Sequence, residues 1–162
     1  MSWPKPIQVV GLGSPLGLDQ IGWQIINGLQ TKTPSGIKRY CLYGGQQLLD
    51  VIEPSGTLLL IDAMKGYKKL GDRYHLTWPN QQLENFKSHS SHSLSIDEVL
   101  QLGQTLGLLP RVIEIFGIEI GNELSSNILE PAQIPELLQA RDALIAYLNG
   151  RIDESIQESE RE

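Results

Sequence analysis

The sequence has one cysteine, Cys41, among its 162 residues. A single thiol can form neither a disulfide within the chain nor a zinc cluster of cysteines, so the sequence suits a reducing compartment. The first ten residues, MSWPKPIQVV, contain no long apolar stretch of the signal-peptide type. No apolar run elsewhere approaches the roughly 18 residues that span a bilayer. These absences predict a cytoplasmic protein without membrane insertion.

Positive charge is also scarce, with 13 Lys and Arg against 19 Asp and Glu and a net charge of -6. No stripe of cations interleaves with aromatic residues, so nucleic-acid binding is not expected. The length fits one domain, which we expect over residues 1–150. Residues 151–162 carry five acids and two arginines with only two isoleucines. This composition predicts a charged, disordered tail.

Apolar runs and helical patterns alternate along the chain. Strands are predicted at Ile7–Leu12, Ile37–Tyr43, Thr57–Ala63, Arg73–Trp78 and Arg111–Gly117. Apolar positions with helical spacing lie between most of these runs, and a last helix is predicted from about Pro135 to Leu148, before Asn149-Gly150. The pattern predicts the α/β class, as a three-layer α/β/α sandwich around a mixed, mostly parallel sheet of about five strands.

A glycine-rich turn, GLGSPLG, follows the first predicted strand. A strand, a glycine turn and a helix are the elements that bind a dinucleotide phosphate. The glycines here are spaced G-x-G-x-x-x-G, Pro15 has no amide to donate, and the second strand ends in Tyr43-Gly44-Gly45 without the acid that would bind a ribose. A nucleotide-binding protein that uses the Gly11–Gly17 turn therefore remains only an alternative.

Two acids are expected at the same rim of the sheet. Asp19 comes after the glycine turn, and Asp62 ends the most apolar strand; ligands of open α/β sheets collect at the carboxyl ends of the strands. His89 and His92 lie in a serine-rich loop before a helix whose start is marked by the capping-box spacing of Ser95 and Glu98. Two carboxylates and an imidazole would suit nickel or zinc.

Each of these residues also has an ordinary structural interpretation. Asp19 could be a helix N-cap, Asp62 could accept hydrogen bonds from loop amides, and His92 could be a solvated loop residue. His75 alternates within a predicted strand and is interpreted as structural. The sequence has no G-x-S-x-G elbow, and Cys41 lies in a strand pattern, so a serine or cysteine nucleophile has no good candidate.

The order of these motifs resembles the hydrogenase maturation proteases, the endopeptidases that trim the C-terminus of the large subunit of nickel-iron hydrogenases. The matching segments, over roughly Val9 to Tyr147, are GLGSPLGLDQIG, YGGQ, LLLIDA and SSHSLSIDEVL. The resemblance implies that Asp19, Asp62 and His92 bind nickel and serve the cleavage. It further implies that the nickel arrives with the substrate, a large-subunit precursor already loaded with metal.

The sequence departs from the family pattern at several positions. Ser14 replaces an asparagine, Tyr43 and Gln46 replace the acid and threonine of a D-G-G-T turn, and an acidic pair is reduced to one acid. Counted back from Ile21-Gly22 in the family alignment, the ligand position falls on Asp19. If the alignment gap lies on the other side of this position, the ligand position falls on Gln20. A noncatalytic assembly chaperone that binds the same precursor is therefore a second alternative. We expect a monomer.

Overall fold

The computed structural model describes residues 2–30, 36–66, 68–86, 94–121 and 128–161. A five-stranded sheet lies at its centre, with the strand order β2-β1-β3-β5-β4. The strands are β1 (Ile7–Leu12), β2 (Ile37–Leu42), β3 (Thr57–Met64), β4 (Arg73–Thr77) and β5 (Val112–Glu119). All neighbouring strands pair in parallel except β4, which runs antiparallel to β5. The predicted mixed, mostly parallel sheet is confirmed.

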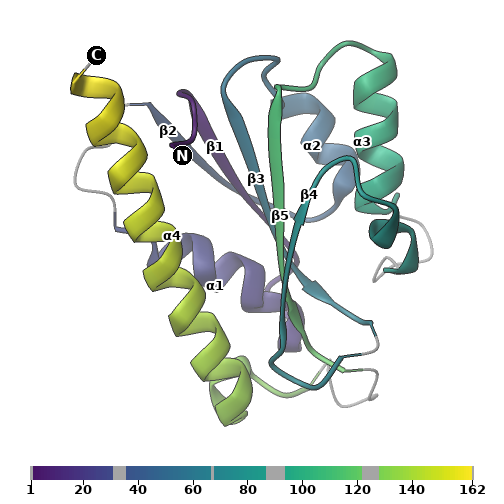
Figure 1. Ribbon diagram of the computed structural model, residues 1–162. Helices are drawn as coiled ribbons and strands as arrows, with labels where there is room; N and C mark the ends of the chain where they lie inside the picture. The colour runs from purple at the N-terminus through teal and green to yellow at the C-terminus, as the bar shows by residue number, and fades with distance from the viewer. Residues whose placement is uncertain (1, 31–35, 67, 87–93, 122–127, 162) are drawn as a thin grey trace.

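Helices cover both faces of this sheet. The helices are α1 (Ile21–Gly28), α2 (Gly45–Val51), α3 (Ile96–Thr105) and α4 (Pro135–Arg161), with short 3₁₀ helices η1 (Gly17–Gln20), η2 (Gln81–Asn85) and η4 (Pro131–Gln133). Figure 1 shows α1 and α4 on one face and α2 and α3 on the other. The chain therefore has the predicted three-layer arrangement. No helix in the described ranges is long and apolar enough to cross a membrane.

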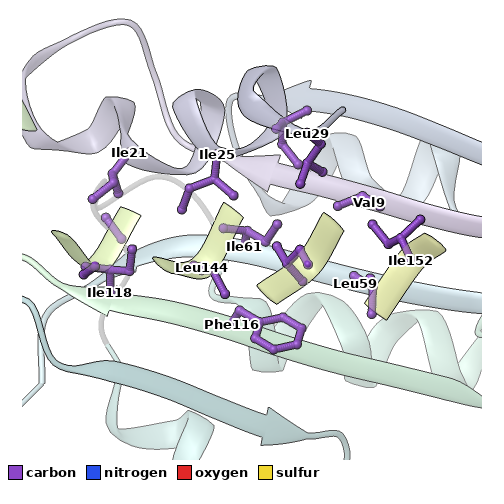
Figure 2. Close-up of a cluster of buried hydrophobic side chains, with 14 of the residues drawn as sticks. Val9, Ile21, Ile25, Leu29, Leu59, Ile61, Phe116, Ile118, Leu144 and Ile152 are labelled. Atoms are coloured by element: carbon purple, nitrogen blue, oxygen red, sulfur yellow. The ribbon is translucent and has the colours of Figure 1, made fainter. Parts of the chain in front are cut away.

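The two faces of the sheet bury separate apolar clusters because successive strand residues point to opposite sides. On one side, Leu59 and Ile61 of β3 pack with Ile25 of α1 and Leu144 of α4 (Figure 2). On the other side, Leu60 of β3 packs in a cluster with residues of α2 and α3. β1 and β3 are apolar along almost their whole length because both of their faces are covered.

The start of α3 follows the predicted capping box. The Ser95 hydroxyl oxygen accepts a hydrogen bond from the Glu98 amide at 3.2 Å, and Glu98 Oε1 accepts one from the Ser95 amide at 3.4 Å. Each bond satisfies an amide that would otherwise lack a partner at a helix N-terminus. This cap fixes where the segment that follows the serine-rich loop becomes helical.

The prediction of a disordered tail over residues 151–162 is wrong for the described residues. α4 continues without a break through Asn149-Gly150 to Arg161. Ile152 and Ile156 are buried in the cluster beneath α4, and the Ser155 hydroxyl accepts a hydrogen bond from the Trp3 amide at 2.8 Å. Burial of these residues stabilises the last turns despite their charge. The predicted boundary at residue 150 therefore falls inside a helix.

Gly150 lies within α4, where it lowers helix stability. It is exposed, and a Cβ at this position would have no neighbouring atom within 4 Å. Replacing glycine by alanine at an unstrained, exposed helix position stabilises by about 0.5–1 kcal/mol. We expect Gly150→Ala to raise the midpoint of thermal unfolding. The matched control is Gly71→Ala, which should lower it, since Gly71 has φ +88° and its Cβ would lie 2.8 Å from the Glu136 carbonyl oxygen. An unchanged or lower midpoint for Gly150→Ala would contradict a helix that is continuous at this position.

Candidate functional site

The candidate site lies where the chain order of the sheet reverses. From β1 the chain moves outward to β2 and then returns to β3 on the other side of β1. Such a reversal separates the loops that follow the two central strands and opens a crevice at their carboxyl ends. The turn that follows β1 carries Asp19, and Asp62 lies near the carboxyl end of β3. The topology thus brings the segments carrying both predicted acids to one rim.

Three amides of the glycine turn already have hydrogen-bond acceptors within the protein. The Gly13 amide donates to the Leu42 carbonyl at 3.0 Å, and the Ser14 amide donates to the Asp19 carbonyl at 3.3 Å. The Leu16 amide donates to the Ser14 hydroxyl oxygen at 3.3 Å, and Pro15 has none to offer. A phosphate cradle needs such amides pointing outward. The nucleotide-binding alternative is therefore disfavoured by the turn itself.

Close backbone packing places Asp19 at this rim. A Cβ at Gly13 would lie 2.3 Å from the Asp19 carbonyl oxygen, so only glycine permits this approach. A Cβ at Gly22, in the first turn of α1, would lie 2.5 Å from the Leu12 carbonyl oxygen and 3.1 Å from that of Ile61. α1 therefore begins directly against the ends of β1 and β3. The 3₁₀ helix that carries Asp19 contacts β3 as a result.

Asp19 is not a helix N-cap. It is the third residue of η1, whose N-cap is Leu16, and the N-cap of α1 is Gln20. Gln20 Nε2 donates to Glu130 Oε2 at 3.0 Å, so the amide group of Gln20 contacts the η4 side of the molecule. Asp19, in contrast, interacts electrostatically with Asp62. The two residues thus make different contacts, and Asp19 as the ligand stays a prediction.

Asp62 sits in β3 beside Gly117 of β5. Part of the residue is exposed, but Oδ1 is buried and has no hydrogen-bond partner in the described part of the chain. Loss of solvation raises the pKa of the Asp62 carboxyl well above its usual range, and the neighbouring negative charge of Asp19 raises it further. The Ala63 backbone amide opposes this rise by hydrogen bonding to the carboxylate. One strand amide, that of Ala63, thus contacts the Asp62 carboxylate, and Oδ1 is left without a partner among the described residues.

The raised pKa of Asp62 makes a prediction about stability. Below the pKa of an unfolded aspartate both states are protonated, and ionisation costs nothing. Between that pKa and the higher folded-state pKa, the unfolded state is ionised while the folded state keeps its proton, so stability falls as the pH rises. Above the folded-state pKa the loss is complete, because the folded state then carries a desolvated charge beside Asp19. Asp62→Asn, which cannot ionise, should therefore match the wild type near pH 3 and be more stable near pH 8.

Chemical denaturation across this pH range measures the effect. The control is Asp50→Asn, since Asp50 is exposed on α2 and its replacement should leave the pH profile nearly unchanged. A stability difference between Asp62→Asn and the wild type that does not grow with pH would mean that Asp62 ionises without penalty.

His92, the third predicted site residue, lies outside the described residues, as does His89. Leu94, two residues after His92, lies at the rim where α2 begins: a Cβ at Gly45 would be 3.1 Å from the Leu94 carbonyl oxygen. Within the described ranges, no group of three or more His, Cys, Asp or Glu side chains could hold a metal ion. The described chain thus supplies two of the three predicted ligands as neighbours.

A buried carboxylate that the sequence analysis missed organises the loops at this rim. Glu119, 1% exposed at the end of β5, accepts hydrogen bonds from the Tyr74 hydroxyl at 2.6 Å and from the amides of Gly66 and Gly121 at 2.8 and 2.9 Å. Burial, and then the bond to Glu119, raises the pKa of the Tyr74 phenol above its ordinary value. Glu119 joins the loops that follow β3 and β5. Its only sequence signal was an acid between Ile118 and Ile120, just beyond the predicted strand end at Gly117.

His75 and Cys41 have surroundings of their own. His75 Nε2 is 2.5 Å from Glu114 Oε1, and its ring stacks on Phe116 with 4.4 Å between centroids. The structural interpretation of His75 agrees with these contacts. Cys41 is half-buried in β2, and burial raises the pKa of its thiol. Since the thiolate is the reactive form, Cys41 is a poor nucleophile.

Solved structures with this fold include hydrogenase maturation enzymes. The hydrogenase maturating endopeptidase HybD from E. coli matches with a TM-score of 0.67 and 22% identity, over 89% of this chain and 92% of that one. An endopeptidase from Escherichia coli matches with a TM-score of 0.63 and 20% identity, over 94% and 93%.

An archaeal protein matches as well. The [NiFe] hydrogenase maturation protease HycI from Thermococcus kodakarensis KOD1 does so with a TM-score of 0.60 and 14% identity, over 93% of both chains. No protein-family model and no curated protein sequence matches. The resemblance that the motifs indicate is therefore confirmed in three dimensions: over about nine-tenths of its length, this chain has the fold of the hydrogenase maturation endopeptidases.

Proposed function

We propose that this protein is an endopeptidase that removes the C-terminal extension from a nickel-loaded precursor of a nickel-iron hydrogenase large subunit. The observation that carries the proposal is the pair formed by Asp19 and Asp62 at the switch point between β1 and β3. The fold is that of proteins named as hydrogenase maturation endopeptidases. Sequence motifs in the same order support the same activity.

The carboxylate pair fits a divalent cation. Two neighbouring carboxylates repel one another, and Asp62 carries the additional cost of burial. A cation between them would relieve both costs, and the unpaired Asp62 Oδ1 is an available donor. We propose that Asp19, Asp62 and His92 bind the nickel of the precursor. In this proposal the metal arrives with the substrate, and the protein contributes an open set of ligands.

Nickel held at this rim would also position the bond to be cut. A divalent ion polarises a carbonyl group or lowers the pKa of a bound water, either of which promotes hydrolysis of a peptide bond. The roles of Asp19, Asp62 and His92 would then be to bind the loaded precursor and orient the scissile bond. A serine or cysteine nucleophile is not required, in keeping with the lack of a G-x-S-x-G elbow in the sequence. We place this reaction in the cytoplasm, with a monomeric enzyme.

The test is to incubate the purified protein with precursor that has or lacks nickel and to measure the precursor mass. Loss of the C-terminal extension only from the nickel-loaded precursor is expected. A stable complex with the loaded precursor and no mass loss would identify the protein as a noncatalytic assembly chaperone. Equal cleavage of both precursors would contradict the role of substrate nickel.

A further inference from the structure

Three exposed apolar side chains gather in segments that follow the carboxyl ends of strands. Among large apolar residues of the described ranges, Ile128, Leu16 and Tyr43 are the most exposed, at 82%, 68% and 65%. Leu16 follows β1, Tyr43 follows β2, and Ile128 follows β5. Single exposed apolar residues are common on protein surfaces, but the grouping of the three most exposed ones at one rim indicates an interaction surface.

Hydrogen bonds and ring contacts join Leu16 and Tyr43 to the turn that carries Asp19. Leu16 belongs to this turn, and its amide donates to the Ser14 hydroxyl oxygen. The Tyr43 ring packs edge-on against Trp23, with 5.0 Å between centroids. Trp23 Nε1 donates at 3.1 Å to the Leu42 carbonyl, which also accepts the Gly13 amide. Tyr43 is thus held beside the turn on a fixed aromatic support.

Ile128 lies in the segment before α4, and this segment contacts η1. Glu130, two residues further along, accepts the Gln20 side-chain amide at 3.0 Å, and Gln20 is the neighbour of Asp19. The Glu130 amide in turn donates to Gln133 Oε1 at 2.7 Å, which anchors this segment on η4. Ile128 thus lies two residues from a side chain that contacts the neighbour of Asp19. We infer that the three apolar side chains and the two acids share one region of the surface.

We propose that Leu16, Tyr43 and Ile128 form a docking surface for the folded body of the metal-loaded precursor, separate from the groups that bind its nickel. The proposal rests on the proposed function. Charge complementarity selects this occupant, because an apolar rim around two neighbouring carboxylates fits a protein surface whose centre is cationic. Tyrosine held in place by packing is the kind of side chain that dominates binding energy at protein interfaces.

The test compares the wild type with the combined variant Leu16→Ser, Tyr43→Ser, Ile128→Ser. Both are titrated with purified nickel-loaded precursor by calorimetry, and kcat and KM are measured for its cleavage. The combined variant should bind about 10-fold or more weakly and raise KM by a similar factor, with kcat nearly unchanged. Leu106→Ser is the control, since Leu106 is 57% exposed beyond the end of α3 and should change none of these quantities.

Ile128→Ser alone is measured as well, in case the combined variant does not fold. This single variant should fold normally, because a side chain that is 82% exposed contributes little to stability. It should weaken binding by about 3-fold or more while the melting temperature stays constant. Wild-type affinity of both variants, with the wild type cleaving normally, would overturn the docking surface and leave the protease proposal standing. A wild type that neither binds nor cleaves the precursor would overturn both. A wild-type dimer that the combined variant loses would assign the surface to a second copy of this chain.

Discussion

Replacing Asp62 by asparagine should lower the rate of precursor processing by a factor of 100 or more, on the order of the loss seen when one essential catalytic interaction is removed. The change is nearly isosteric, yet it removes the negative charge that would face the nickel. The buried Oδ1 of Asp62 has no hydrogen-bond partner in the described chain, so the substitution breaks no described contact of that oxygen. The loss of activity would therefore not follow from a loss of structure.

The same variant should be more stable than the wild type at neutral pH, because asparagine avoids the cost of ionising a carboxyl whose pKa is raised by burial. Loss of function accompanied by a gain in stability separates a functional carboxylate from a structural one. The measurements are single-turnover processing and the midpoint of unfolding on one preparation. Asp50→Asn, at an exposed position on α2, should leave both unchanged. Normal processing by Asp62→Asn would remove this residue from the site.

Truncation of Ile152 to alanine should cost about 2–4 kcal/mol of unfolding free energy. Ile152 is fully buried and belongs to the part of α4 that was predicted from its composition to be a disordered tail. Its removal leaves a cavity where α4 packs against the sheet. Figure 2 shows this side chain among those of Val9 and Leu59. Urea denaturation of the variant measures the loss.

Glu154→Ala is the matched control, two residues along the same helix but exposed, and should stay within about 0.5 kcal/mol of the wild type. A midpoint of Ile152→Ala equal to that of the control would mean that residues after Gly150 do not pack on the core. This result would support the predicted domain boundary at residue 150.

The error over this last segment has a physical origin. Charge density and Asn149-Gly150 both indicated an end to the helix, since glycine often terminates helices by adopting a positive φ. Gly150 instead stays helical. Leu144, Leu148, Ile152 and Ile156 recur every four residues and share one face, so their burial stabilises the helix through the glycine. Periodicity was the better guide here than local stop signals.

The shared rim of the segments that carry Asp19 and Asp62 was predictable from the sequence, because segments that follow neighbouring parallel strands meet at the same edge of the sheet. The close packing at Gly13 and Gly22 that positions Asp19 within this rim was not predictable. The hydrogen bond of the Gly13 amide was not predictable, because its acceptor Leu42 lies 29 residues further along the chain, at the end of β2. The contact between His75 and Glu114 was not predictable either, because it depends on the antiparallel pairing of β4 with β5.

The role of Glu119 could not be found from the sequence either. An acid between apolar residues indicates a buried charge, but β5 runs two residues past its predicted end, and the partners of Glu119 lie around Gly66, Tyr74 and Gly121. Only the assembled rim shows that these three donors converge on one carboxylate. The sequence therefore indicated a buried acid near the end of β5 but not the three groups that bind it.

The mass of the large-subunit precursor after incubation with this protein tests the central claim most directly. Nickel-loaded precursor should lose the mass of its C-terminal extension, nickel-free precursor should keep it, and Asp62→Asn should cleave neither. An unchanged mass of the loaded precursor after incubation with the wild-type protein, with or without a stable complex, would contradict the proposed endopeptidase.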